Sequence, residues 1–157
     1  VAEDYPREFV KYSRGLRDLA LILTDPYTHC SVRGIWLYGP PGTGKSHVAR
    51  SFDPDSYIKS QNKWWDGYVD QETVILDDLD TNHLGHHLKI WADKWSCTGE
   101  TKGGTVQLRH KIFIVTSNYS PEDLFIADPV MCTAISRRFK IINKTAKGQL
   151  VDFLVLN

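Results

Sequence analysis

Several features are missing from this 157-residue chain, and each absence removes a class of protein. No apolar run approaches the roughly 20 residues that a membrane-spanning helix needs, and we expect no signal peptide. The three cysteines are odd in number and include no Cys-x-x-Cys pair. This argues against a disulfide framework and a zinc site, and it fits a reducing compartment. Basic and acidic residues balance at 19 each, so a nucleic-acid-binding surface must be local.

What remains is the composition of an ordinary soluble globule, with 41% hydrophobic and 24% charged residues. A chain of this length is expected to form one domain that buries about 70% of its unfolded surface. Because the sequence begins at Val1 rather than Met, we expect a fragment that other domains flank.

The chain is organised around the stretch Gly39-Pro40-Pro41-Gly42-Thr43-Gly44-Lys45-Ser46. A glycine, four further residues and then Gly-Lys-Ser form the P-loop pattern, here between a strand-forming run at 35–38 and a helix-forming run at 46–51. Backbone N–H groups and the helix dipole would converge on a triphosphate. We expect Lys45 to reach the β- and γ-phosphates and the Ser46 hydroxyl to ligate Mg²⁺. The alternative is a Gly/Pro turn that merely precedes Lys-Ser.

Two apolar runs end in polar residues of the kind found in the active sites of enzymes that hydrolyse nucleotides. The run 73–76 ends at Asp77 and Asp78, and the run 111–117 ends at Asn118. Such runs favour strands of a parallel sheet, whose carboxyl ends meet at the edge where ligands bind. We expect Asp77 to hold the hydration shell of Mg²⁺ and Asp78 to polarise the attacking water. Taken alone, the two acids are equally a strand cap and Asn118 is equally a turn residue.

Residues 98–109 predict a β-hairpin with a two-residue turn at Gly103-Gly104, which places Lys102 at or beside the tip. Between residues 89 and 111 there are five Lys or Arg against two acids, a local excess of three positive charges in a neutral chain. A lysine at a hairpin tip is usually only solvated. Projected into the hole of a ring, it could grip a phosphate backbone without reading sequence.

Arg137 and Arg138 precede an apolar run, 139–142, that we expect to form an edge strand. Two adjacent arginines can be no more than the charged end of a helix. They are also suitably placed for an arginine finger that crosses to the γ-phosphate of a neighbouring subunit.

Three other segments carry weaker predictions. Periodicity predicts an amphipathic helix over 7–23 that packs on its own core or on a neighbouring subunit. The loop 62–68 contains Trp64 and Trp65, for which we favour core packing over a platform for a base or for a neighbouring subunit. A helix capped by residues 80–82 is expected from near His83. Its apolar face would comprise Leu84, Leu88, Trp91, Ala92 and Trp95.

Together these motifs resemble the superfamily 3 helicases, in particular the ATPase domain of replication-initiator (Rep) proteins of circovirus-like, circular single-stranded DNA viruses. The resemblance covers about residues 1–145 and rests on six stretches: 39–46, 62–68, 74–78, 100–106, 114–118 and 135–139. It implies an α/β P-loop NTPase fold of AAA+/superfamily 3 type with a central, mostly parallel sheet and flanking helices. We expect an N-terminal helical segment at 1–30, the core at 31–145 and an unassigned tail at 146–157.

The resemblance also implies an ATP-hydrolysing helicase that translocates on single-stranded DNA during rolling-circle replication of a viral genome. ATP and Mg²⁺ are the implied cofactors. The implied partners are single-stranded DNA and further copies of the chain, expected as a hexameric ring, in the host nucleus. An N-terminal nicking domain is expected in the full-length protein, although nothing in this chain supplies its nuclease residues.

Residue by residue, the resemblance assigns 39–46 as Walker A, Asp77 and Asp78 as Walker B, and Asn118 as the sensor. It assigns Lys102 and Gly103 to a DNA-gripping hairpin, and Arg138 as the finger with Arg137 in reserve. The alternative function is a nucleotide-dependent assembly module without unwinding. A small-molecule kinase is a weaker alternative, because the chain has no long lid insertion.

Overall fold

The computed structural model describes residues 26–153, so the helix predicted over 7–23 lies outside the described residues. Five strands form the central sheet in the order β2-β3-β6-β1-β7, and every neighbouring pair is parallel. The strands are β1 (Gly34–Tyr38), β2 (Tyr57–Lys59), β3 (Thr73–Leu76), β6 (Ile112–Ser117) and β7 (Phe139–Asn143). The predicted α/β fold with a central, mostly parallel sheet is therefore confirmed, and β7 is an edge strand as expected.

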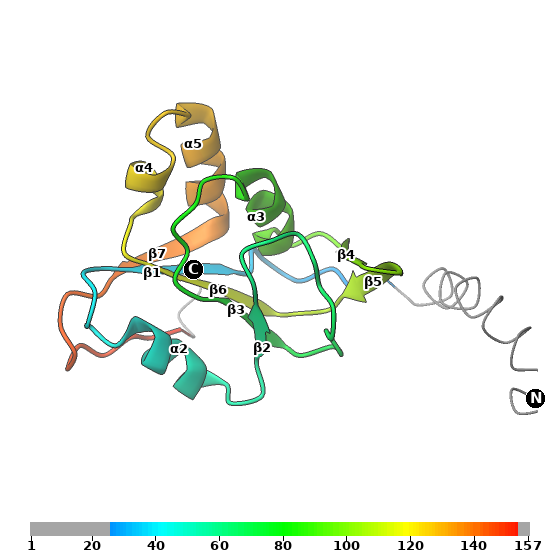
Figure 1. Cartoon of the computed structure of the whole chain (residues 1–157), viewed down its shortest axis with the longest axis horizontal. Helices are drawn as coiled ribbons and strands as arrows, with labels where there is room; N and C mark the ends of the chain where they lie inside the picture. The colour runs from blue at the N-terminus through cyan, green and yellow to red at the C-terminus, as the bar shows by residue number, and fades with distance from the viewer. Residues whose placement is uncertain (1–25, 154–157) are drawn as a thin grey trace, which may run out of the picture.

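Helices cover both faces of the sheet (Figure 1). On one face lies α2 (Lys45–Phe52), and on the other lie α3 (Gly85–Ala92), the single turn α4 (Pro121–Leu124) and α5 (Pro129–Arg138). These helices lie in the crossover connections that parallel strands need, and they cover the apolar faces of the sheet.

The core has two halves because alternate residues of a strand point to opposite faces. Trp36, Phe113 and Val115 pack on the side of α3 and α5. Ile35 and Ile114 pack on the side of α2, together with partly buried side chains of that helix. All four residues of β3 are buried, as the continuous apolar run predicted.

The register brings the polar ends of three strands together. Leu76 of β3 lies opposite Val115 of β6, so the residues that follow, Asp77 and Thr116, reach the same edge of the sheet. At the next pair, Tyr38 lies opposite Ser117, and Gly39 N donates to the Ser117 carbonyl at 3.2 Å. The P-loop, the Walker B acids and Asn118 therefore all leave the sheet at its carboxyl edge.

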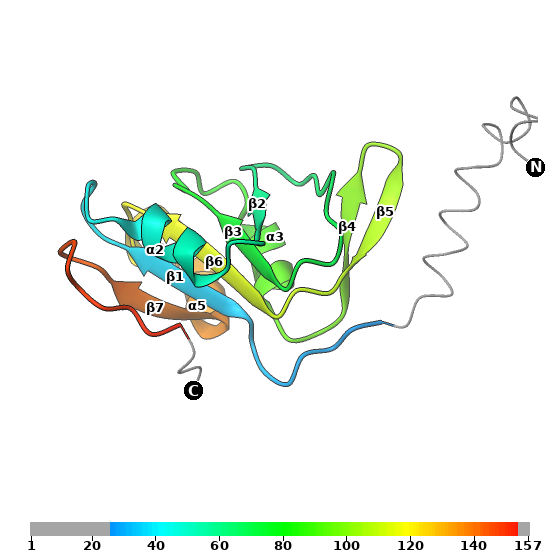
Figure 2. The same ribbon diagram turned by 90° about the horizontal axis from the view of Figure 1, so that it is seen from below.

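A separate antiparallel hairpin, β4 (Cys97–Thr101) and β5 (Gly104–Leu108), stands apart from the central sheet (Figure 2). Thr101 pairs with Gly104, so the two-residue turn is Lys102-Gly103. The predicted turn at Gly103-Gly104 is one residue too late, because Gly104 takes part in the strand ladder. The placement of Lys102 at the tip is correct.

The predicted helix near His83 exists but is shorter at both ends. It begins at Gly85 without a side-chain cap, so capping by residues 80–82 is wrong. It ends at Ala92, because Asp93 is extended and Arg33 binds the carbonyls of the next two residues at 3.0 and 2.8 Å. The predicted apolar face therefore holds as far as Ala92, whereas Trp95 is 60% exposed.

The two tryptophans of the 62–68 loop differ in environment. Trp65 is fully buried, and its ring stacks on Tyr57 with a centroid distance of 5.6 Å. Trp64 is only half-buried, and Lys63 Nζ lies 4.7 Å from its ring centroid. Core packing is thus confirmed for Trp65.

The last described residues pack under the P-loop helix. Phe153 is buried with its ring centroid 5.0 Å from that of Phe52 in α2. The domain boundary expected at residue 145 remains a prediction. Within residues 26–153, no helix is long and apolar enough to cross a membrane.

Candidate nucleotide-binding and catalytic site

The P-loop connects β1 to α2, and its lysine is folded back onto the loop. Lys45 Nζ donates to the carbonyls of Gly39 at 3.0 Å and Pro40 at 2.8 Å, and to Asn118 Oδ1 at 3.1 Å. Thr43 Oγ1 also donates to the Pro40 carbonyl at 3.0 Å. Burial lowers the pKa of Lys45, and the nearby Asp78 carboxylate offsets part of this shift by raising the pKa. Among residues 26–153, Lys45 forms no salt bridge, so its buried ammonium is suited to an anionic ligand.

The loop conformation depends on glycine at two positions. Gly42 has φ 80° and Gly44 has φ 81°, left-handed values that a side chain disfavours. Gly44 is also the N-cap of α2, and no side chain caps this helix. The first N–H groups of α2 are thus available to an anion at the positive end of the helix dipole.

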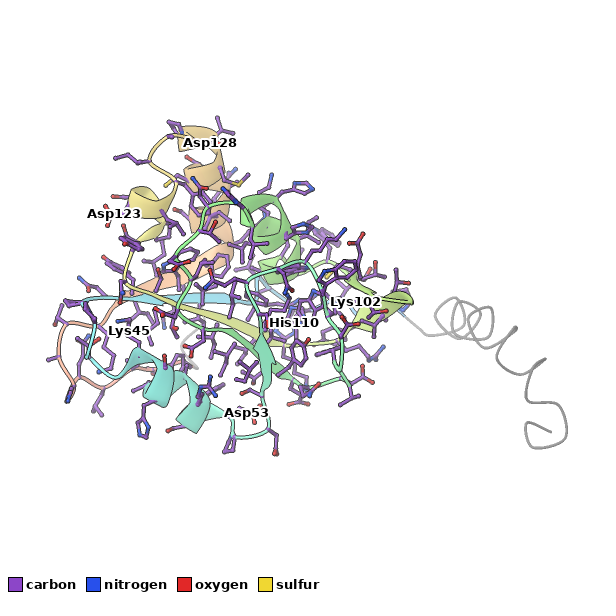
Figure 3. All side chains as sticks on the ribbon, in the orientation of Figure 1. Lys45, Asp53, Lys102, His110, Asp123 and Asp128 are labelled. Atoms are coloured by element: carbon purple, nitrogen blue, oxygen red, sulfur yellow. The ribbon has the colours of Figure 1, made fainter. Side chains whose placement is uncertain are left out.

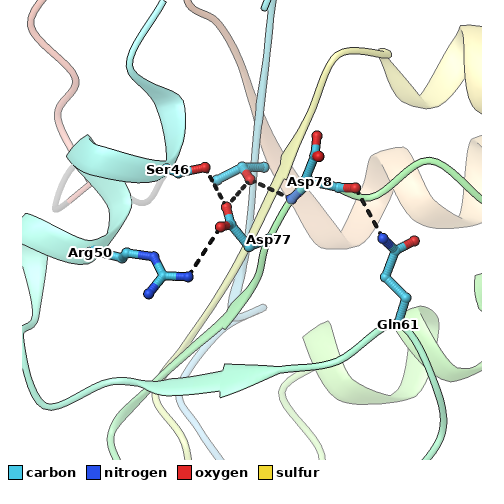
Figure 4. A network of polar contacts seen from close by, with 6 residues as sticks. Ser46, Arg50, Gln61, Asp77 and Asp78 are labelled. Carbon is cyan, nitrogen blue, oxygen red and sulfur yellow. Dashed lines mark hydrogen bonds and ion pairs between the residues drawn. The ribbon is translucent and has the colours of Figure 1, made fainter. Parts of the chain in front are cut away.

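Asp77 is the most heavily hydrogen-bonded carboxylate at this edge (Figure 4). Its Oδ1 accepts from Ser46 Oγ and from Thr116 Oγ1, each at 2.6 Å, and its Oδ2 lies 3.3 Å from a guanidinium nitrogen of Arg50. Burial alone raises the pKa of this carboxyl, but the hydrogen bonds from these three donors outweigh burial and lower the pKa of Asp77. The group is therefore held as a carboxylate.

Asp78 follows in an unusual backbone conformation. Its φ is 56°, a left-handed value that is uncommon for a residue with a Cβ. Thr116 Oγ1 accepts the N–H of Asp78 at 2.8 Å, and Gln61 Nε2 donates to its carbonyl at 3.1 Å. The Asp78 side chain is exposed beside the P-loop, so it is accessible to water and to a bound ligand.

One open pocket of about 480 Å³ collects most of the predicted site. Of the predicted residues, Pro41, Gly42, Gly44, Lys45, Ser46, Asp77, Asp78 and Asn118 line it, together with His47 and Thr116. Gly39, Pro40 and Thr43 form the back of the loop through their contacts with Lys45.

The two candidate finger arginines lie at the opposite edge of the sheet. Arg138 ends α5, and the next residue, Phe139, pairs with Gly34 at the start of β1, whereas the P-loop follows the end of β1. Five strand residues span about 16 Å. Arg138 and the exposed Arg137 therefore do not join the P-loop pocket of their own chain.

Lys102 is also remote from the P-loop pocket. Figure 3 shows Lys45 on the left of the described part of the chain and Lys102 on its right, at the hairpin. The Lys102 side chain is exposed at the hairpin tip, where its backbone N–H donates to Asp66 Oδ1 at 3.0 Å. The Lys102 side chain can therefore contact a ligand that lies outside the P-loop pocket.

Three residues of the site were not predicted. Thr116 could have been identified, because it precedes Asn118 in a strand that neighbours β3, and Arg50 lies four residues after Ser46 on the same face of α2. Gln61 contacts the Asp78 turn from the loop after β2. No sequence pattern singles out this glutamine.

The residues at this edge fit a magnesium nucleotide. Ser46 Oγ and Asp77 Oδ1 lie 2.6 Å apart and are hard oxygen ligands of the kind that Mg²⁺ prefers. The buried Lys45 ammonium and the uncapped helix start offer positive charge for phosphates. Asp78 and Asn118 add a hydrogen-bond acceptor and an amide at the same pocket. The arrangement supports phosphoryl transfer to water.

Comparison with known proteins agrees with this geometry. A family model described as RNA helicase matches residues 35–119, which include the P-loop, the Walker B acids and Asn118. The replication-associated protein of Pigeon circovirus is 36% identical over 144 residues, covering 92% of this chain and 44% of the relative. That of Porcine circovirus 1 is 38% identical over 163 residues, covering 97% and 51%.

A genome polyprotein of Human klassevirus 1 is 34% identical over 100 residues, covering 55% of this chain and 4% of the polyprotein. The chain spans about half the length of the two circovirus relatives. More than half of the chain matches the helicase model. The chain therefore belongs to the superfamily 3 helicase family, in the form found in circovirus-like replication-initiator proteins, as its motifs predicted.

Proposed function

We propose that this chain is the ATP-hydrolysing motor of a viral replication protein and that it moves along single-stranded DNA as one subunit of a ring. The observation that carries the proposal is the single pocket lined by Lys45, Ser46, Asp77, Asp78 and Asn118. Such a set binds a nucleoside triphosphate and also places an acid and an amide where water would attack it.

In this proposal each residue has one task in hydrolysis. Lys45 and the first N–H groups of α2 bind the β- and γ-phosphates, with Lys45 exchanging its present loop carbonyls for phosphate oxygens. Ser46 and Asp77 hold Mg²⁺, which supplies charge neutralisation on the phosphates when bound. Asp78 accepts a hydrogen bond from the attacking water, and Asn118 orients it.

Chemically, the water oxygen bonds to the γ-phosphorus while the bond to the leaving ADP oxygen breaks. Asp78 receives the proton of the water in this proposal. Asn118 is suited to report the state of the γ-phosphate, because its Oδ1 already lies 3.1 Å from Lys45 Nζ.

The position of the arginines supports the proposed ring. Arg137 and Arg138 end α5 at the amino edge of the sheet, away from the pocket of their own chain. In a head-to-tail assembly this edge of one copy would face the carboxyl edge of the next. Arg138 would then neutralise charge on the γ-phosphate bound by its neighbour. We propose a hexamer, acting in the host nucleus.

The hairpin supplies the contact with nucleic acid in this proposal. Lys102 and Gly103 form its turn, and the Lys102 side chain is exposed. A single ammonium at a tip contacts phosphate without reading bases, which suits movement along any sequence. We also propose that a nicking domain precedes this chain in the full-length protein.

The test is ATP hydrolysis with and without a single-stranded oligonucleotide at low salt, in parallel for DNA and RNA. We expect stimulation by DNA, loss of hydrolysis in Lys45→Ala, and loss of unwinding in Lys102→Ala with Lys111→Ala as the control lysine outside the hairpin. Normal unwinding by Lys102→Ala would overturn the hairpin assignment. If neither DNA nor RNA stimulates hydrolysis, a nucleotide-dependent assembly module is favoured. If only RNA stimulates it, the proposal that the chain moves along DNA is wrong.

A further inference from the structure

The loop after β2 contacts the turn that presents Asp78. Gln61 donates through Nε2 to the Asp78 carbonyl at 3.1 Å (Figure 4). Its Oε1 accepts from Asp80 N at 3.3 Å. A left-handed residue with a side chain persists only where its surroundings hold it. On the other side of this turn, Thr116 of β6 holds the N–H of Asp78 at 2.8 Å. Gln61 is therefore one of two side chains that hold the Asp78 backbone.

Five residues further on, the same loop holds the tip of the hairpin. Asp66 Oδ1 accepts the backbone N–H of Lys102 at 3.0 Å. Trp65 N donates to the Glu100 carbonyl at 2.8 Å, and Lys63 Nζ lies 3.1 Å from the Glu100 carboxylate. These contacts attach β4 and the turn of the hairpin to residues 63–66.

A buried lysine at the start of this segment holds the loop in place. Lys59 Nζ donates to the carbonyls of Ser60 and Asn62 and, at 3.2 Å, to Asn62 Oδ1. Asn62 Oδ1 in turn accepts Trp64 N at 3.0 Å. Lys59 is 2% exposed, and its ammonium lies 5.0 Å from the ring centroid of Trp91. Buried donors and acceptors cost free energy when unpaired, so this loop favours one conformation.

From these contacts we propose that residues 59–66, which we call the strap, couple the ATP site mechanically to the DNA-gripping hairpin. Gln61 and Asp66 are its two positioning residues, one for Asp78 and the other for Lys102. The five residue steps between them span at most about 17 Å. A shift of the Asp78 turn on hydrolysis therefore moves the Lys102 backbone through a short, internally bonded segment. The inference rests on the proposed function, because it takes the hairpin to hold single-stranded DNA.

The first test breaks the hairpin end. Asp66→Ala removes the acceptor for Lys102 N–H, whereas Asp66→Asn keeps an oxygen in its place. Asp53→Ala is the matched control, because Asp53 Oδ1 accepts the N–H of Asp55 at 3.0 Å in a turn outside the strap. At saturating oligonucleotide, we expect the ratio of hydrolysis rates with and without DNA to fall at least about threefold in Asp66→Ala. Asp66→Asn and Asp53→Ala should retain the wild-type ratio.

The second test breaks the ATP end. Gln61→Ala loses both contacts, and Gln61→Glu keeps the acceptor for Asp80 N but loses the donor to the Asp78 carbonyl. Gln71→Ala is the control, because Gln71 Oε1 accepts the nearby Val69 N at 2.8 Å in a turn outside the strap. We expect both Gln61 variants to lower kcat by about threefold or more with KM for ATP changed less than about twofold. A general loss of folding would instead lower the amount of active protein and the melting temperature.

A third measurement separates this inference from the proposed function. Hydrogen exchange of the hairpin peptide containing Lys102 is compared with ADP and with a non-hydrolysable ATP analogue, without DNA. We expect a nucleotide-dependent difference in wild type that disappears in Gln61→Ala and Asp66→Ala. If DNA fails to stimulate wild-type hydrolysis, the proposed function fails while the exchange experiment still decides the coupling. No nucleotide-dependent difference in wild type, or the same difference in both variants, overturns the coupling.

Discussion

Arg138 is bound to Asp93 of its own chain, with Nε 3.0 Å from Oδ2, at the sheet edge opposite the P-loop. Its NH1 also donates to the Ala134 carbonyl at 2.8 Å. The neighbouring Arg137 is exposed and forms no ion pair within residues 26–153. Asp93 therefore fixes the direction of Arg138 but not that of Arg137. Because a functional side chain works best when it is already oriented, this favours Arg138 as the finger.

If the active site is shared, two inactive variants should restore each other. Lys45→Ala lacks the P-loop ammonium and Arg138→Ala lacks the finger, so we expect each alone to lose about 10³-fold in kcat. Mixed before assembly, they form some interfaces in which an intact P-loop faces an intact arginine. Hydrolysis should therefore reappear in the mixture.

The control mixture combines Lys45→Ala with Asp77→Asn, whose lesions lie in the same pocket. No interface in that mixture has a complete pocket, so no activity is expected. Hydrolysis by Arg138→Ala alone, together with an inactive Arg137→Ala that recovers when mixed with Lys45→Ala, would exchange the roles of the two arginines.

Thr116→Val should weaken the proposed magnesium site without removing a proposed ligand. The hydroxyl donates to Asp77 Oδ1 at 2.6 Å and accepts Asp78 N at 2.8 Å, and valine has the same shape without either bond. Partners of a metal ligand typically contribute about 10- to 100-fold in metal affinity. We expect a loss in that range for Mg²⁺ in a titration of hydrolysis, and Thr116→Ser should restore it.

The same variant should shift the pH dependence of hydrolysis. The Thr116 bond is one of those that lower the pKa of Asp77, so its removal raises that pKa. The acidic limb of the kcat/KM profile should therefore move to higher pH in Thr116→Val and stay in place in Thr116→Ser. An unchanged acidic limb in Thr116→Val would mean that Asp77 does not govern it.

Acid should destabilise the fold through His110. This imidazole is fully buried, and its Nε2 bonds to the Trp91 carbonyl at 2.7 Å. Burial, aided by the charge of Arg33, lowers the pKa of His110 to about 3. Between pH 6.5 and 3 the unfolded chain binds a proton that the folded chain does not, so stability falls as pH falls through this range.

The expected loss is about 2 kcal/mol between pH 7.5 and pH 5, from the ordinary histidine pKa of about 6.5. Urea unfolding at the two pH values measures it. His110→Gln should be less stable at neutral pH but should lose the part of the pH dependence that comes from this ring. If the free energy of unfolding changes equally with pH in wild type and in His110→Gln, His110 is not the group responsible.

Gly99→Ala should disturb the packing of the hairpin on the strap and so lower the stability of the fold. A Cβ at Gly99 would lie 2.5 Å from the Trp65 ring, which is fully buried and has no room to move. Overpacking of this kind costs about 1–3 kcal/mol. Gly148→Ala is the matched control, because nothing lies within 4 Å of a Cβ there. Thermal unfolding should show a lower midpoint for Gly99→Ala alone.

The sequence predicted which residues gather in the pocket at the carboxyl edge of the sheet, because each part of the pattern is local. Glycines, lysine and serine at fixed spacing define the loop, and a buried apolar run followed by an acid defines the end of a parallel strand. Since parallel strands end at one edge, Asp77 and Asn118 could be placed beside Lys45 without knowing any contact. The structure agrees, with Lys45 Nζ 3.1 Å from Asn118 Oδ1.

Predictions failed where a distant residue overrode the local pattern. Helical periodicity continued to Trp95, but the helix ends where Asp93 is extended, and Arg33 binds the carbonyls of Lys94 and Trp95 from 61 and 62 residues away. The hairpin turn shifted to Lys102-Gly103, a register in which Asp66 accepts the N–H of Lys102 from 36 residues away.

By itself the sequence determined a P-loop, the strands that end in Asp77-Asp78 and Asn118, and hence the chemistry at one edge of a parallel sheet. Only the tertiary structure decided that Asp93 holds Arg138 at the other edge, and that Gln61 and Asp66 connect the Asp78 turn to Lys102. The physical reason is that dihedral preference and burial are encoded locally. A hydrogen bond between Gln61 and Asp78, 17 residues apart, forms only when two packed elements place both groups within reach.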